Sequence, residues 1–158
     1  QTYILCTLVD QVITEQAKKK DKPFFVERSI FSGKYVFAAA AFEQHWMSEI
    51  EKKLYDYMWQ REFARNQLIP DGIIYLRAPA QICFERIVKR GRFEEHPITL
   101  EYIQLLERLY DAWLSQAQRM DDSMRHVPVL KLDLSGDWIH DLHMQEKLFS
   151  QVSVFVKN

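Results

Sequence analysis

Three short apolar segments, bounded by helix breakers or polar turns, constrain the fold of this chain most. They span residues 24–26, 73–76 and 127–132. Short apolar runs of this kind are typical of buried strands. Helical periodicity is expected in the remaining stretches, over residues 1–20, about 34–66, 79–90, 100–119 and about 138–155. Because strands alternate with helices, we expect an α/β fold with a parallel sheet covered by helices on both faces.

Composition limits the class of protein further. The chain has 158 residues, of which 47% are hydrophobic, with only 4 glycines and 5 prolines. This length fits one domain with a sizeable core and argues against a disordered protein. The formal net charge is −1, whereas a general nucleic-acid or membrane-surface binder is usually more basic. No apolar run approaches the roughly 18 residues of a spanning helix. From the charge and the absence of such a run, we expect neither nucleic acid nor a membrane as a partner.

An acid and an arginine, Glu27 and Arg28, directly follow the first expected strand. Such a pair next to a buried strand is costly unless each charge has a partner or a ligand. One interpretation is a structural ion pair. The other is a phosphate or metal site, in which Arg28 holds an anion and Glu27 binds a hydrated cation.

A second group of charges, here called the arginine cluster, consists of Arg86, Arg90 and Arg92. Arg86 and Arg90 share one face of the expected helix and have no acid three or four residues away within it. Their arrangement predicts either a site for a polyanion such as triphosphate or a solvated helix face. The acids that follow, Glu94 and Glu95, would either order the arginines without a ligand or accept hydrogen bonds from sugar hydroxyls.

Two common ligand motifs are absent from the sequence. The only Gly-Lys pair, Gly33 and Lys34, lacks the other residues of a phosphate-binding loop. His140 and His143 share a helix face with acids nearby, but no typical third ligand follows at a suitable spacing, so we expect no metal there. Cys6 and Cys83 cannot form a disulfide framework, and a reducing compartment is the default expectation.

With these residues in place, the sequence resembles the deoxynucleoside kinases of the deoxycytidine, deoxyguanosine and mitochondrial thymidine kinase group. The most specific part is the combination of Glu27-Arg28-Ser29 with the arginine cluster at this separation. The similarity covers nearly the whole chain and rests on residues 1–3, 27–32, 35–37, 71–76, 86–92, 94–95, 100–102 and 113–114. It implies a P-loop-kinase-like, three-layer fold, and transfer of the γ-phosphoryl group of ATP to the 5′-hydroxyl of a deoxynucleoside.

The resemblance also implies roles for individual residues. The base would be bound by the amide of Gln1 and stacked on Phe37, and the sugar 3′-hydroxyl would be held by Glu95. Arg28 would lie near the 5′-hydroxyl and the transferring phosphate, with Glu27 near Mg²⁺. The remaining assignments concern ATP: its phosphates would be held by Arg86, Arg90 and Arg92, and its adenine by the loop containing Gly136, Asp137 and Trp138.

Substrate preference is indicated by two positions. Relatives that prefer deoxycytidine and purines carry an Arg–Asp pair beside the base, and the matching positions here are Leu8 and Gly33. Loss of both charges removes a polar contact and leaves room for a 5-methyl group. The hypothesis is therefore a preference for thymidine and deoxycytidine over purine deoxynucleosides.

The chain departs from the family pattern at its start. The family's phosphate-binding loop, its general-base glutamate and its first two strands precede the position that matches Gln1. We therefore expect residues 1–158 to be the C-terminal part of a single kinase domain, without detectable turnover alone. The chain would be a fragment of an active kinase, the product of a gene model that lacks its start, or an inactive truncated relative that acts as a binding or structural module.

Two further expectations concern assembly and compartment. Family members are usually homodimers, and a stripe of four apolar residues at four-residue spacing would serve that contact or pack on the sheet: Phe42, Trp46, Ile50 and Leu54. The compartment would be cytoplasmic or mitochondrial, since a targeting segment would precede this chain.

Overall fold

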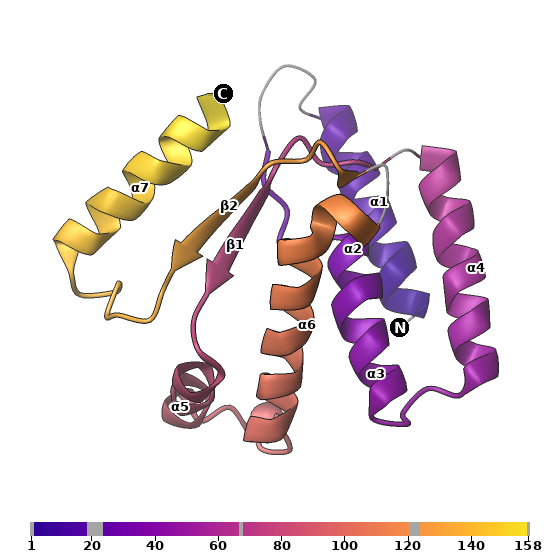
Figure 1. Ribbon diagram of the computed structural model, residues 1–158, viewed down its shortest axis with the longest axis horizontal. Coiled ribbons are helices and arrows are strands. Elements are labelled where there is room, and N and C mark those ends of the chain that lie inside the picture. Colours follow the sequence, from indigo (N-terminus) through magenta and orange to yellow (C-terminus); the bar gives the residue numbers. More distant parts are fainter. Residues whose placement is uncertain (1, 19–23, 67, 121–123, 158) are drawn as a thin grey trace. The chain divides into compact units, whose positions relative to one another are not determined.

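Helices make up most of the computed structural model, which describes residues 2–18, 24–66, 68–120 and 124–157 (Figure 1). Of residues 115–120 only the backbone is described. In chain order the elements are α1 (Thr2–Lys18), α2 (Ile30–Ser32), the π-helix η1 (Gly33–Ala38), α3 (Ala39–Glu43), α4 (Glu49–Asn66), β1 (Ile73–Arg77), α5 (Ala80–Arg90), the 3₁₀-helix η2 (Phe93–Glu95), α6 (Leu100–Met120), β2 (Val129–Asp133) and α7 (Leu142–Lys157).

The chain divides into two compact units, which are described separately. The first unit comprises residues 1–69 and 108–115, and the second comprises residues 70–107 and 116–158. None of the described helices combines the length and the apolar character that crossing a membrane requires.

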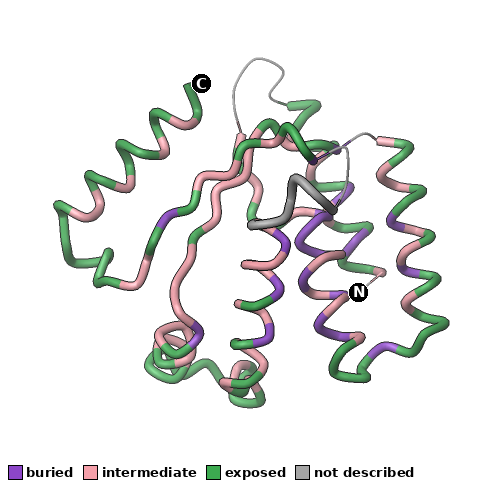
Figure 2. Tube along the Cα trace, in the orientation of Figure 1, coloured by how far each residue is buried: buried purple, intermediate pink, exposed green. Residues whose placement is uncertain are grey.

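Aromatic packing forms the core of the first unit. Phe31 is fully buried and makes edge contacts with Trp59 and Phe63, at centroid distances of 5.6 and 5.7 Å. The indole Nε1 of Trp59 donates a hydrogen bond to the main-chain oxygen of Ile30 at 2.9 Å. Figure 2 shows buried residues gathered along α2, η1 and α3. The long helix α4 is thereby fastened to the segment that follows Glu27 and Arg28.

The single helix expected over residues 34–66 is wrong, because the chain turns between α3 and α4. His45 has a φ of +57°, a left-handed conformation that no helix continues through. Ser48 then begins α4 with a capping box: its hydroxyl accepts from the Glu51 N–H at 3.3 Å, and the Glu51 carboxylate accepts from the Ser48 N–H at 2.8 Å. The Ser-x-x-Glu pattern at 48–51 was the sequence signal for this boundary.

The parallel sheet of the second unit confirms two of the expected strands. β1 pairs with β2 in register from Ile73 opposite Val129 to Arg77 opposite Asp133. α5 follows β1, and Gly91 ends it with a φ of +65°, as its helix-stop position predicted. α7 lies beside β2 (Figure 1) and begins at Leu142 rather than 138, because the Asp141 carboxylate accepts from the Met144 N–H at 3.0 Å and caps the helix there.

The expected strand at residues 24–26 is wrong. These residues have no regular secondary structure, and Phe25 is 66% exposed. A strand is stable only through hydrogen bonds to a neighbouring strand, and this segment pairs with no part of the chain that the structure describes. The described sheet therefore has the α/β class that was expected, with two strands in place of three.

Candidate active site

Arg28, predicted near the transferring phosphate, and Phe37, predicted to stack on the base, contact each other in the first unit. The Arg28 guanidinium carbon is 4.6 Å from the centre of the Phe37 ring, a cation–π contact. Arg28 has a φ of +67°, which is uncommon for a residue with a side chain and occurs often at functional sites. Glu27 and Arg28 are both exposed and form no ion pair with each other among the described contacts. The structural ion pair that the sequence left open is therefore not found.

The short helix after Arg28 is held by its own serines. The Ser29 hydroxyl accepts from the Ser32 N–H at 3.2 Å, and the Ser32 hydroxyl accepts from the Ser29 N–H at 3.0 Å. This capping box begins α2, which continues into the π-helix η1 that carries Phe37. π-Helical turns are rare and are frequent at functional sites. Phe37 also makes an edge contact with Tyr110, at a centroid distance of 6.2 Å.

Gly33 lies against a buried tyrosine. A Cβ atom at Gly33 would be 3.2 Å from the hydroxyl oxygen of Tyr55, whose side chain is only 2% exposed. Burial raises the pKa of Tyr55, so its hydroxyl is neutral and can donate a hydrogen bond at neutral pH. A larger residue at position 33 must displace this hydroxyl. Leu8 is half-buried on α1, and none of its atoms lies within 4 Å of the position that a Cβ atom at Gly33 would take.

The arginine cluster lies in the second unit, and its members have partners. Arg86 of α5 donates to the main-chain oxygens of Leu134 and Gly136, at 2.8 and 2.9 Å. Arg90 forms a bidentate pair with Glu95, and the Arg92 guanidinium is 3.8 Å from the same carboxylate. These partners lie 48, 50 and 5 residues away, beyond the three- or four-residue spacing within the helix, and the contact with Glu95 is the ordering role that the sequence offered for this acid.

The loop between β2 and α7, residues 134–141, is held from several sides. Besides Arg86, the side chain of Gln145 donates to the main-chain oxygens of Trp138 and Ile139, at 3.1 and 2.8 Å. His140 lies 2.9 Å from Asp137, and the hydrogen bond from His140 lowers the pKa of Asp137. The predicted adenine residues Asp137 and Trp138 therefore belong to a loop that is directly attached to Arg86. Trp138 is 37% exposed.

The N-terminus of α5 is capped by Glu107, a residue that the sequence did not indicate. One oxygen of Glu107 accepts from Arg77 at 3.0 Å, and the other accepts from the Ala80 N–H at 3.0 Å. Pro79, which precedes the helix, has no side chain that could cap it. Glu107 thus replaces the missing N-cap from α6. Because Arg77 lies 30 residues away in the sequence, no local pattern could have shown this contact.

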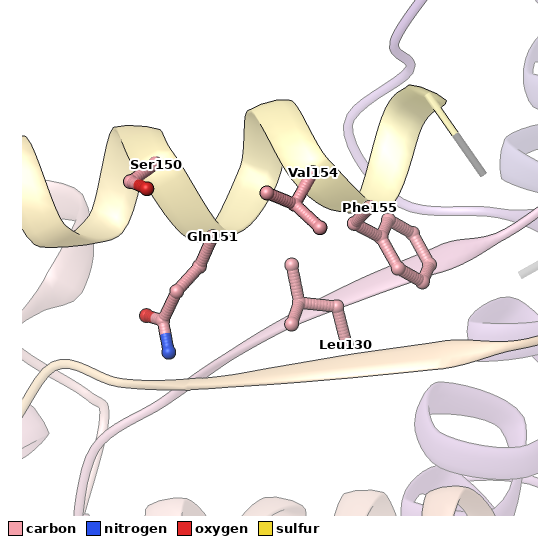
Figure 3. A pocket seen from close by; sticks show the side chains of 5 residues that line it. All are labelled: Leu130, Ser150, Gln151, Val154 and Phe155. Carbon is pink, nitrogen blue, oxygen red and sulfur yellow. The ribbon is translucent and has the colours of Figure 1, made fainter.

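Among the described residues, neither a metal site nor the pocket involves the predicted site residues. No group of three or more His, Cys, Asp or Glu side chains that could hold a metal ion occurs there, so His140 and His143 form no such centre. A shallow apolar pocket lies between β2 and α7, where Leu130, Val154 and Phe155 face one space (Figure 3). It contains none of the predicted site residues. Gln1 lies outside the described residues, and its contact with a base stays a prediction.

Clustered guanidiniums beside a preorganised loop define a candidate site for a phosphate-bearing ligand on an α/β scaffold. The chain belongs to the deoxynucleoside kinase family, since the family model "Deoxynucleoside kinase" matches residues 1–157.

Relatives with curated names agree with this family. The chain is 38% identical to deoxycytidine kinase 2 of Gallus gallus over 136 residues, which cover 84% of this chain and 51% of the relative. It is 34% identical to the probable deoxycytidine kinase of fowlpox virus, covering 99% and 65%. It is 32% identical to the mitochondrial deoxyguanosine kinase of Xenopus laevis, covering 88% and 54%. The chain therefore spans about half to two thirds of the length of these relatives.

A solved structure supports the fold. The structure of deoxyadenosine kinase from M. mycoides with bound dATP matches with a TM-score of 0.69 and 20% identity, over 94% of this chain and 71% of that chain. At this identity the match shows a shared fold.

Proposed function

We propose that the protein containing this chain transfers the γ-phosphoryl group of ATP to the 5′-hydroxyl of a deoxynucleoside, and that residues 1–158 are the C-terminal part of a single kinase domain. The proposal includes the complete P-loop-kinase-like fold, a three-layer parallel sheet with helices on both faces. The observation that carries it is the arginine cluster, in which Arg86 is attached to the loop 134–141 and Arg90 and Arg92 share one carboxylate. Guanidiniums in this number can bind the phosphates of ATP and neutralise charge during transfer.

The base and the 5′-hydroxyl of the nucleoside would be bound by residues of the first unit. Phe37 offers a ring for base stacking, and Arg28, which already contacts that ring, carries the charge for the transferring phosphate. Gln1 would hydrogen-bond the base, and Glu95 would accept the sugar 3′-hydroxyl. Asp137 and Trp138 would hold the adenine of ATP. Family membership and the described positions of Arg28, Phe37 and the arginine cluster support these assignments.

Mg²⁺ would be held through Glu27. The Glu27 carboxylate is exposed and forms no described ion pair, so it is available to water molecules of a hydrated ion. Magnesium usually binds one or two carboxylates together with substrate phosphates, and it needs no larger cluster of ligands. When bound, the ion neutralises phosphate charge.

The base preference would be thymidine and deoxycytidine over purine deoxynucleosides. Gly33 and Leu8 provide no charged side chain for the base, and the Tyr55 hydroxyl lies 3.2 Å from the position that a Cβ atom of residue 33 would take. The curated relatives include a deoxycytidine kinase and a deoxyguanosine kinase, so family membership alone leaves the choice of base open. A comparison of kcat/KM for thymidine and for purine deoxynucleosides tests the preference, and a higher value for purines would refute it.

Assembly and compartment form a further part of the proposal. Trp46, Ile50 and Leu54 of the expected stripe are 66, 80 and 55% exposed, and a second copy of the chain would cover them in a homodimer. The compartment would be cytoplasmic or mitochondrial.

Phosphorylation of thymidine by ATP tests the activity. The protein translated from the complete reading frame should form thymidine 5′-monophosphate, and residues 1–158 alone should form none. Absence of product from the complete protein would favour the alternative, an inactive relative that serves as a binding or structural module.

A further inference from the structure

Arg90 and Glu95 form a bidentate pair, an arrangement in which a guanidinium can also bind a phosphate. Arg90 Nε donates to Oε2 of Glu95 at 3.0 Å, and its Nη2 lies 2.8 Å from both carboxylate oxygens. Arg92 Nη1 is 3.8 Å from Oε1 of the same group. The Glu95 side chain is 19% exposed, less than the 46% of Arg90. A carboxylate and a phosphoryl group both offer two oxygens to a guanidinium fork.

One guanidinium edge cannot bind both groups in this way at once. A phosphate that binds to Arg90 with the same two donors must therefore displace Glu95. Displacement leaves Glu95 without its principal cation, Arg90. The phosphate then replaces Glu95 as the anion beside Arg90 and Arg92. The freed carboxylate then becomes an acceptor for another hydrogen-bond donor.

We propose that Glu95 is an internal competitor for the phosphate site of Arg90, and that phosphate binding releases Glu95 to the 3′-hydroxyl of the nucleoside. The release of Glu95 to the sugar rests on the proposed function, because it makes a nucleoside hydroxyl the new hydrogen-bond donor to the Glu95 carboxylate. The exchange links the two substrates: polyphosphate is bound less tightly while Glu95 holds Arg90, and nucleoside is bound more tightly once Glu95 has left.

The two explanations of the Arg90–Glu95 pair predict different changes in the affinity for phosphate. If Glu95 only orders the arginines, removing its charge weakens phosphate binding or leaves it unchanged. If Glu95 competes, removing its charge strengthens phosphate binding. Because the Arg90–Glu95 pair is partly exposed, its removal should change the affinity for phosphate by a factor of up to about five.

The chain provides a matched control in the neighbouring residue. Glu94 is exposed and lies one position away, and it forms no ion pair among the described contacts. Glu94→Gln and Glu95→Gln remove the same charge from the same short helix, η2. General electrostatic attraction of an anion increases equally in both variants, whereas relief of competition occurs only in Glu95→Gln.

Calorimetric titration of the complete protein with inorganic tripolyphosphate at fixed ionic strength tests the competition. Glu95→Gln should bind about two- to fivefold more tightly than the unchanged chain, and by a larger factor than Glu94→Gln. The gain should disappear when Arg90→Gln is added. Equal gains in both glutamate variants, no gain, weaker binding by Glu95→Gln, or no binding by any of the proteins would each overturn the proposal.

A second titration tests the release of Glu95 toward the sugar. Thymidine should bind to the complete protein more tightly when tripolyphosphate is present, and 3′-deoxythymidine, which lacks the hydroxyl, should show no such gain. Equal behaviour of the two nucleosides would refute the release. These binding measurements do not depend on turnover. A protein that shows competition but makes no thymidine monophosphate would therefore refute the kinase proposal and retain the competition.

Discussion

Arg86 shows how a single side chain can connect two parts of a site. Its two hydrogen bonds to the oxygens of Leu134 and Gly136 fasten the loop 134–141 to α5. Each hydrogen bond of this kind contributes about 1 kcal/mol, and more when the donor is charged. Arg86 is therefore a positioning residue for the loop as well as a candidate phosphate ligand.

Arg86→Ala should release the loop. We expect amide hydrogen exchange in residues 135–139 to rise by about tenfold, since loss of about 1.4 kcal/mol of local stability corresponds to that factor. Lys89→Ala is the matched control: Lys89 is an exposed cation of the same helix, three residues away. Equal exchange in the two variants, as followed by mass spectrometry, would contradict a positioning role for Arg86.

Gly33 and Tyr55 allow a test of the packing beneath the proposed base site. A methyl group at position 33 would approach the Tyr55 hydroxyl to 3.2 Å, which is tight for a side chain that is 2% exposed. Gly33→Ala should therefore be more favourable by about 1 kcal/mol when Tyr55→Phe has removed the hydroxyl. Urea unfolding of the two single variants and the double variant measures this coupling. A coupling energy of zero would show that the hydroxyl moves aside freely.

At the scale of elements, the start of α4 depends on its capping box. Ser48→Ala should lower the free energy of unfolding by about 1 kcal/mol, because it removes the hydroxyl that accepts from the Glu51 N–H. Thermal and urea unfolding measure this loss. No change in stability would mean that the turn before α4 is fixed by other contacts.

The same capping box predicts a pH dependence. The main-chain N–H of Ser48 and then its hydroxyl lower the pKa of Glu51. A lowered pKa in the folded state stabilises the fold above the ordinary pKa of a glutamate, and this stabilisation is lost as the pH falls through the lowered value. Glu51→Gln should therefore destabilise the protein at pH 7 and have little effect at about pH 3. Glu49→Gln, in the same first turn, should show a smaller difference. Equal costs at both pH values would contradict this account.

Local patterns in the sequence were sufficient for some elements and not for others. β1, α5 with its stop at Gly91, α6 and α7 follow from apolar runs, periodicity and glycine conformation, which act over a few residues. Residues 24–26 have the composition of a strand, but a strand also needs a partner, and none is described for them. The turn at His45 interrupts a continuous apolar stripe that by itself indicates one long helix, and the Ser-x-x-Glu pattern at 48–51 is the local signal that marks the new start.

Local patterns were likewise sufficient for some residues of the candidate site and not for their contacts. Residue type and spacing indicated the arginine cluster and Glu95, and family resemblance supplied their roles. The partners of Arg86 and the cap supplied by Glu107 connect residues 27 to 50 positions apart, so only the fold brings them together. The contact of Arg28 with Phe37 likewise depends on the π-helix η1, which no recognisable local pattern predicts.

At the scale of the whole molecule, the exposed part of the stripe predicts self-association. Ile50 and Leu54 are 80 and 55% exposed on α4. Ile50→Glu should raise the dissociation constant of the proposed homodimer at least about tenfold, because it would place an unpaired carboxylate in an apolar contact. Val88→Glu, at an exposed apolar position of α5, is the control and should leave assembly unchanged. Sedimentation that shows a monomer before any substitution, or a dimer unaffected by Ile50→Glu, would contradict the proposed interface.

The central claim is that Arg28 and the arginine cluster serve phosphoryl transfer from ATP to a deoxynucleoside. The most direct measurement follows the γ-phosphate of ATP into thymidine 5′-monophosphate, using the complete protein and its Arg28→Ala and Arg90→Ala variants with their folding checked by circular dichroism. The account predicts product from the unchanged protein and a loss of kcat/KM of about a hundredfold in each folded variant, since each removes a charge that stabilises the transferring phosphate. Absence of product, or undiminished turnover in both variants, would contradict it.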